Sequence, residues 1–235
     1  MTVDISESRM DKKVLNTIVF LHFDRHANNL QPKDIRGAIS ALCPNEILLH
    51  QHLDDNSVKY KYPLVQYKYV KGNCLLLGIE EGAKLISNLN LVGKSIVFSN
   101  DTYKILKKDT FIEEFPYGIN KVNSVYSFLT PWLALNEKNY EKYQKLGGWA
   151  KRKELLEKIL IGNIISMSKS LGYTVPEPIK ASIDKLKEVP TSLKGTPMLG
   201  FLGTFSVNFD IPDYWGIGKS VSRGFGTIKS WRVKS

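Results

Sequence analysis

The stretch VLNTIVFLHFD, Val14–Asp24, has the strongest strand pattern near the start of the chain, because β-branched and aromatic residues dominate it. A helical pattern follows at Gln31–Leu42, QPKDIRGAISAL, in which proline stands at an early helical position. After this helix the sequence predicts an extended segment at Ile47–His52. A buried strand followed by an amphipathic helix and more extended chain favours an α+β fold.

Two further strands are predicted at Tyr60–Val70 and Cys74–Glu80, and the Lys-Gly-Asn turn between them is typical of a β-hairpin. Glu81–Asn90 then has the pattern of a short amphipathic helix, and a strand is expected at Lys94–Ser99. The order strand, helix, strand pair, helix, strand is that of a split-βαβ, or ferredoxin-like, domain.

The second half of the chain has a less regular pattern. Its predicted elements are short strands at Phe111–Pro116 and Ser124–Leu129, helices at Asn136–Leu146 and Trp149–Leu171, a short helix or loop after Pro178, and strands at Met198–Phe209 and Thr227–Val233. This half is again α+β, so we expect two domains that join near residues 100–110.

The chain of 235 residues carries 33 lysines and arginines against 23 acidic residues, a formal net charge of +10. This excess favours a polyanionic partner, with nucleic acid ahead of an anionic membrane surface. Eleven tyrosines, ten phenylalanines and four tryptophans add faces on which bases can stack.

Other classes are excluded by what the sequence lacks. Two cysteines cannot form a disulfide framework, and Met1–Lys13 has no apolar signal-peptide core. The apolar runs are much shorter than the roughly 18–20 residues that cross a bilayer. We therefore expect a soluble, cytoplasmic protein that does not bind a membrane.

A glycine-rich segment, Trp215–Trp231, contains two G-x-G pairs separated by five residues. Neither nucleotide-binding motif fits it: a P-loop would need glycine at Asp213, and the third glycine of a dinucleotide fingerprint falls at Val221 or Lys229. No cofactor is therefore expected. The glycines and basic residues that favour phosphate binding are Gly216, Gly218, Lys219, Arg223, Gly224 and Gly226. A flexible hairpin whose glycines only serve turns explains the segment equally well.

A second candidate site is the H-x-H pair His50 and His52 in LLHQHLDD. On a strand these side chains share one face, with Cα atoms about 6.5 Å apart. One imidazole would then take the proton of a ribose 2′-OH while the other protonates the departing 5′-oxygen, leaving a 2′,3′-cyclic phosphate without any metal. Lys59 or Lys61 would stabilise the phosphorane, and Tyr60 or Tyr62 would orient an imidazole. From the residues alone, two surface histidines on an edge strand remain the simpler interpretation.

The remaining chemistry-bearing residues are assigned to other roles. HQHLDD matches the start of an H-x-H-x-D-H zinc motif, but its last histidine is Asp55 here and no histidine follows, so a metal site is not expected. His22 alternates within the first strand and is expected to be structural. Arg36, on the first helix, could contact a phosphate, but a solvated helix face is the expected position.

The G-x-G-x5-G-x-G pattern resembles the glycine-rich loop of the CRISPR-associated Cas6 endoribonucleases, of the repeat-associated mysterious protein (RAMP) superfamily. Further stretches similar to one Cas6 subgroup are YKYPLVQYK (Tyr60–Lys68), PWLALNEKNYEKY (Pro131–Tyr143), KILIGNIISMSKSL (Lys158–Leu171) and the chain from Gly203 to Lys229. The resemblance covers nearly the whole chain. It implies two ferredoxin-like (RRM-like) domains in tandem, at 1–105 with the histidine pair and at 106–235 with the glycine-rich loop.

The resemblance also implies an activity. Cas6 proteins cleave CRISPR repeat RNA without metal, commonly with a histidine between the first helix and the following hairpin, where His50 and His52 lie. These two residues would be catalytic, as in a paired-histidine subgroup, with Lys61 and Tyr62 as auxiliary residues and the glycine-rich loop holding the RNA. CRISPR repeat RNA is the expected partner, with other effector-complex subunits as further candidates, and the protein would be a monomer or homodimer. The alternatives are a catalytically inactive RNA-binding subunit of an effector complex and a metal-dependent hydrolase.

Overall fold

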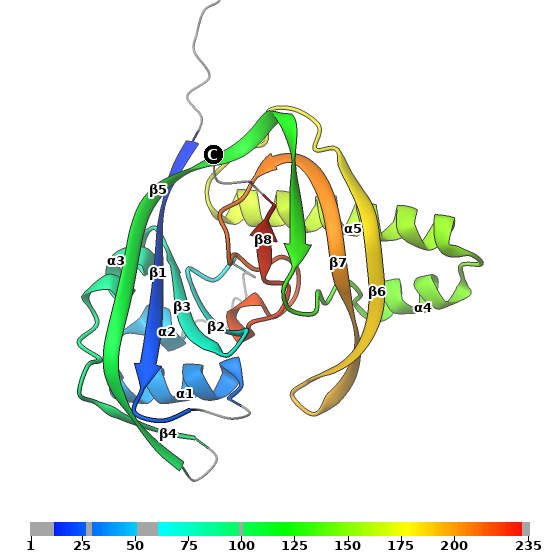
Figure 1. Ribbon diagram of the computed structural model, residues 1–235. Helices are drawn as coiled ribbons and strands as arrows, with labels where there is room; N and C mark the ends of the chain where they lie inside the picture. Colours follow the sequence, from blue (N-terminus) through cyan, green and yellow to red (C-terminus); the bar gives the residue numbers. More distant parts are fainter. Residues whose placement is uncertain (1–11, 27–29, 51–60, 99–100, 232–235) are drawn as a thin grey trace, which may run out of the picture.

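The computed structural model describes residues 12–26, 30–50, 61–98 and 101–231, and shows an α+β fold (Figure 1). Its elements are β1 (Lys12–Phe23), α1 (Pro32–Leu42), α2 (Ile47–His50), β2 (Val65–Val70), β3 (Asn73–Ile79), α3 (Glu81–Asn88), β4 (Ser95–Phe98), β5 (Asp101–Phe128), α4 (Glu137–Lys145), α5 (Trp149–Ser170), β6 (Ala181–Leu193), β7 (Thr196–Asp210), the 3₁₀ turn η1 (Val221–Arg223) and β8 (Ile228–Ser230). In these ranges no helix has the length and apolarity that crossing a bilayer requires.

The first half has the predicted ferredoxin-like order. Its strands are antiparallel neighbours in the order β2-β3-β1-β5, and α1 and α3 connect them. Ile35 and Ile39 of α1 pack with Ile86 of α3 against one face of this sheet. The start of α1 is fixed by Asp34, whose carboxylate accepts the N–H of Gln31 at 3.2 Å.

The second half repeats this strand order. β5 continues through residue 128, and its later part lies between β8 and β7, with β6 at the outer edge. α4 and α5 connect β5 to β6, whereas between β7 and β8 the glycine-rich segment and η1 replace a second helix. One strand, β5, therefore ends the first sheet and begins the second, and the expected boundary at residues 105/106 falls inside it.

Three expected elements differ from the structure. Ile47–His50 is a helical turn and not a strand, because Leu49 N–H bonds to Glu46 and its side chain is buried. The two short strands predicted in residues 111–129 are parts of β5. The segment after Pro178 contains a strand, β6, whose sequence is rich in charge and includes a proline because it forms the exposed edge of the sheet.

A cluster of buried residues joins the two halves of the chain. Trp215, the first residue of the glycine-rich loop, is fully buried, and its indole N–H donates to Asn16 Oδ1 of β1 at 3.0 Å. Its ring also packs against Tyr62 and against Tyr117 of β5, with ring centroids 5.9 and 5.4 Å away. The chain therefore enters the glycine-rich loop from a point anchored on the first sheet.

Candidate functional site

The glycine-rich loop, residues 215–227, lies between the two sheets and forms a closed, packed structure (Figure 1, orange to red). Gly226 N–H donates to Pro131 O and Ile217 N–H donates to Gly226 O, both at 2.9 Å. Gly226 has φ +61°, and a Cβ there would lie 2.0 Å from Ile217 O. Gly224 has φ +85°, and its Cβ would lie 2.5 Å from Pro32 Cγ. These glycines allow close packing within the protein, which the flexible-hairpin interpretation did not include.

One polar row of the first sheet holds this loop. Gln66 Oε1 accepts the N–H of Gly216 at 3.1 Å, and Tyr62 Oη donates to Gly216 O at 2.7 Å. Lys68, two residues after Gln66 and therefore on the same face of β2, donates its amine to Val221 O at 3.2 Å. The stretch YPLVQYK thus supplies three side chains that fasten the loop to the first half.

Burial perturbs two groups of this row. Burial raises the pKa of the Tyr62 hydroxyl, which stays protonated and can donate to the loop. Burial also holds the pKa of Lys68 well below its ordinary 10.5. Among the described carboxylates none forms an ion pair with Lys68, so its amine is buried with a carbonyl as partner.

His50 ends α2 in a turn that several side chains fix. Arg36 Nη2 donates to the carbonyl of His50 at 2.5 Å, while Ser40 Oγ and Tyr67 Oη donate to the carbonyl of Leu49 at 3.1 and 3.2 Å. The imidazole Nε2 of His50 is buried and has no hydrogen-bond partner within the described part of the chain. A buried polar atom without a partner is uncommon in a folded protein, which marks His50 as a candidate functional residue.

His50 lines a hollow of about 300 Å³, here called the histidine cavity. Its wall consists of Lys33, Arg36, Gly37, Ser40, His50 and Arg223. Burial, and then the charge of Arg223, lower the pKa of Arg36. Because the described lining residues include three cations and no carboxylate, the cavity suits an anion.

A second hollow of about 340 Å³, the loop cavity, is lined by other residues of the glycine-rich loop. Its lining includes Lys61, Tyr62, Asn163 of α5, and residues 216–222 of the loop with the exposed Lys219. The loop therefore contributes a cation to each of two basic hollows, Arg223 to the first and Lys219 to the second.

The structure brings only some of the predicted site residues together. His50 shares a cavity with Arg223 of the loop, whereas Lys61 and Tyr62 line the loop cavity, where the Tyr62 hydroxyl is bonded to Gly216. The strand geometry assumed for the histidine pair does not apply to His50, which ends a helical turn. His52, Lys59 and Tyr60 lie outside the described residues.

Sequence reasoning missed the role of α1. Arg36 was expected on a solvated face, but it is partly buried and faces His50 and Arg223. The available signal was the spacing of Lys33, Arg36 and Ser40, which places them on one side of a helix.

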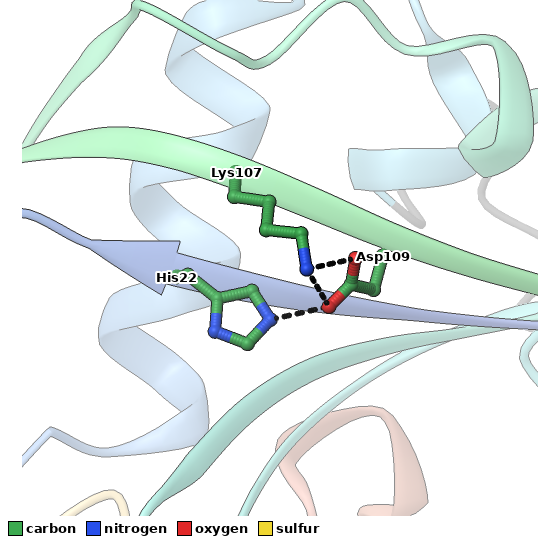
Figure 2. Close-up of polar contacts among 3 residues, drawn as sticks. All are labelled: His22, Lys107 and Asp109. Carbon is green, nitrogen blue, oxygen red and sulfur yellow. Dashed lines mark hydrogen bonds and ion pairs between the residues drawn. The ribbon is translucent and has the colours of Figure 1, made fainter.

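His22 belongs to a separate surface cluster that spans β1 and β5 (Figure 2). Its Nε2 lies 2.9 Å from Asp109 Oδ2, and Lys107 Nζ lies 2.8 Å from Oδ1 of the same carboxylate. The hydrogen bond from Lys107 is the main cause that lowers the pKa of Asp109. The cluster lines neither the histidine cavity nor the loop cavity.

Two family models match this chain. The model of the Cas6b N-terminal domain matches residues 13–116, and that of the Cas6b C-terminal domain matches residues 118–231. A curated relative, the uncharacterized protein MJ0978 of Methanocaldococcus jannaschii, is 47% identical over 143 residues, which are 61% of this chain and 92% of the relative.

Solved structures agree with the family models. A crystal structure of Cas6b is 38% identical, covers 92% of this chain and 99% of its own, and superposes with a TM-score of 0.81. A structure described as the CRISPR RNA processing endoribonuclease Cas6b is 34% identical with the same coverage and a TM-score of 0.72. Csf5, a type IV Cas6 endonuclease, shares the fold at 11% identity and a TM-score of 0.54.

The α+β fold and the repeated strand order are those expected for two ferredoxin-like domains in tandem with a glycine-rich C-terminal loop. The family models together span nearly the whole chain, and the sequence identities extend over most of it. This confirms the resemblance on which the sequence interpretation relied: the chain belongs to the Cas6b family of CRISPR-associated endoribonucleases.

Proposed function

We propose that this chain cleaves CRISPR precursor RNA within the repeats, by attack of a ribose 2′-OH on the adjacent phosphodiester and without a metal ion. The proposal rests on membership of the Cas6b family, one solved member of which is described as a CRISPR RNA processing endoribonuclease. The observation that carries it is the unpartnered Nε2 of His50 beside a cationic cavity. The upstream product ends in a 2′,3′-cyclic phosphate and the downstream product begins with a 5′-hydroxyl.

His50 and His52 act as general base and general acid in this proposal, as in a paired-histidine Cas6 subgroup. A base must reach the proton that it removes, and His50 Nε2 has no competing partner within the described residues. The phosphorane carries more negative charge than the phosphodiester, so cations close to it lower the barrier. Arg36, which donates to the carbonyl of His50, and Arg223 line the same cavity as His50.

The glycine-rich loop holds the RNA backbone, with Lys219 on one side and Arg223 on the other. Lys61 and Tyr62 serve as auxiliary residues on the loop-cavity side: the exposed Lys61 meets the RNA, and Tyr62 fixes Gly216. Each lost phosphate contact lowers the salt dependence of binding to single-stranded RNA by about 0.7 in the log–log slope.

We also propose the setting in which this occurs. The protein works in the cytoplasm as a monomer or homodimer, with other effector-complex subunits as further partners, and the boundary between its two domains lies within β5. Sedimentation of the purified protein with and without repeat RNA determines the oligomeric state.

The test is incubation of the protein with labelled repeat RNA in EDTA. Cleavage should persist in EDTA, should stop when a 2′-deoxy nucleotide precedes the scissile bond, and should yield a cyclic phosphate. Binding without cleavage would instead identify an inactive RNA-binding subunit. Cleavage that EDTA abolishes and zinc or magnesium restores would identify a metal-dependent hydrolase.

A further inference from the structure

Two arginines from opposite halves of the chain meet beside His50. On α1, Lys33, Arg36, Gly37 and Ser40 are spaced i, i+3, i+4 and i+7 and line one wall of the histidine cavity. Arg223 of η1 lines the same cavity. It is nearly two hundred residues away from α1 in sequence, so the fold has to hold the two together.

Packing of the loop backbone places Arg223 there. The next residue, Gly224, lies against Pro32 at the start of α1, where a Cβ would be 2.5 Å from the proline ring. On the other side of Arg223, the carbonyl of Val221 accepts the buried amine of Lys68. Arg223 is therefore positioned by its neighbours in the chain.

The two guanidinium groups repel each other. The charge of Arg223 is one cause that lowers the pKa of Arg36, after burial. Within the described lining of the cavity no carboxylate compensates for either arginine or for Lys33. Like charges held close together cost free energy, and a bound anion removes that cost. A guanidinium is a planar fork of N–H donors that matches a phosphate or a carboxylate, and in the proposed RNA substrate the anion is a phosphate.

Arg36 has a second role. One of its N–H groups donates to the carbonyl of His50, which fixes the turn that carries the imidazole, and among the described residues its guanidinium has no carboxylate partner. The imidazole Nε2 of His50, a residue of the cavity wall, is buried and has no partner among the described residues. His50 lines the same cavity as both arginines, so a phosphate bound there would lie against His50.

We propose that Arg36 and Arg223 form a site for one RNA phosphodiester beside His50, and that Arg36 is also the positioning residue of His50. The site rests on the proposed function for the identity of its ligand, the phosphodiester at the cleavage point. It adds a residue of α1 to the machinery, and it links the glycine-rich loop directly to the catalytic histidine.

The test uses the full chain and repeat RNA blocked by a 2′-deoxy nucleotide, carrying either a normal phosphate or a neutral methylphosphonate at the cleavage point. In the wild type, the methylphosphonate should weaken binding about 10-fold, as expected for a lost charge-assisted contact. In the double variant Arg36→Gln/Arg223→Gln the methylphosphonate should weaken binding less than about 2-fold, because the two guanidinium groups that contact the phosphate are absent. Equal weakening in both proteins would overturn the site.

Matched variants distinguish the effect of charge in the histidine cavity from the effects of side-chain size and of charge elsewhere on the surface. A Cβ at Gly37 would meet nothing within 4 Å, so Gly37→Glu and Gly37→Gln add side chains of one size to the cavity wall. The Gly37→Glu variant should bind RNA about 10-fold more weakly than Gly37→Gln, because it places a carboxylate beside the phosphate.

Arg25→Gln is the location control, since Arg25 is paired with Asp101 away from both cavities. The slope of log RNA affinity against log salt should be the same for Arg25→Gln as for the wild type. A loss of RNA affinity by Arg25→Gln as large as that by Arg36→Gln would overturn the site.

The positioning role has its own readout. Arg36→Lys keeps the positive charge but loses the planar fork of N–H donors. The salt dependence of its RNA binding should therefore match that of the wild type. Its cleavage rate, measured at saturating RNA, should fall about 10-fold or more. Cleavage by Arg36→Lys at the wild-type rate would overturn the positioning role.

Inorganic phosphate, titrated at constant ionic strength, should compete with RNA for the wild type but not for the double variant. A wild type that cleaves no repeat RNA yet shows the methylphosphonate effect would refute the nuclease and leave the phosphate site standing.

Discussion

Replacing Gly224 by alanine tests whether the glycine-rich loop is built to pack against α1. Gly224 has φ +85°, and an added Cβ would lie 2.5 Å from Pro32 Cγ and 3.2 Å from Tyr67 O. Gly93 is a matched control, because it has φ +83° and an added Cβ there would meet nothing within 4 Å. Both substitutions put an alanine in the left-handed region and both restrict the unfolded chain, so these two effects cancel in the comparison.

The magnitude follows from this pairing. The left-handed backbone costs an alanine roughly 1–2 kcal/mol at either position. The steric overlap at Gly224 adds about 1–3 kcal/mol, since a ring and a main-chain oxygen must move. With a slope of about 2 kcal/mol per molar urea, an extra loss of about 2 kcal/mol shifts the unfolding midpoint by about 1 M relative to Gly93→Ala.

The assay is urea unfolding of both variants, together with single-turnover cleavage of repeat RNA. Displacement of the loop from Pro32 also moves Arg223 away from His50. Gly224→Ala should therefore cleave at least about 10-fold more slowly, as a misplacement near 1 Å can cost even more, while Gly93→Ala cleaves like the wild type. Equal unfolding midpoints for the two variants would refute the packing argument.

Three further predictions concern the loop fastening and the surface cluster. Tyr62→Phe removes the donor to Gly216 O and should cost about 1–3 kcal/mol of unfolding free energy, because a buried carbonyl loses its partner; an unchanged urea midpoint would contradict this. Burial lowers the pKa of Lys68 in the folded state, so the unfolded chain binds this proton more tightly. The free energy of unfolding should therefore rise with pH between the lowered pKa of the folded state and the ordinary pKa of 10.5. Lys68→Met should flatten that rise, measured as urea midpoints at several pH values, and an identical pH dependence would count against it. Asp109→Asn breaks the cluster of Figure 2 and should leave the cleavage rate unchanged, whereas a loss of cleavage would mean that the cluster reaches the RNA.

The first half of the fold was predictable because its pattern is local. The apolar alternation of β1 and the helical spacing of α1 both reflect burial against one face, and the hairpin turn carries its own sequence signal. β6 was missed because an edge strand exposes most of its side chains and therefore has no apolar pattern. β5 was divided into two because its exposed middle part, near residues 120–124, has a turn-like composition.

The site was predictable only in part. The glycine spacing identified the loop, but the sequence could not show that these glycines pack against Pro32 and the backbone of Ile217. His50 was found as a motif residue, while its helical turn depends on contacts with Arg36, Ser40 and Tyr67, which come from other elements. Contacts between distant residues of this kind leave no periodic signal in a single sequence.

The central claim is that His50, with His52, performs acid–base cleavage of RNA. The most direct measurement is single-turnover cleavage of labelled repeat RNA in EDTA by the wild type and by His50→Ala/His52→Ala, with RNA binding measured on the same samples. Loss of general acid–base catalysis should slow cleavage by at least about 10²–10⁴-fold, while binding stays measurable because Lys219 and the loop remain. Cleavage by the double variant at the wild-type rate would contradict the account.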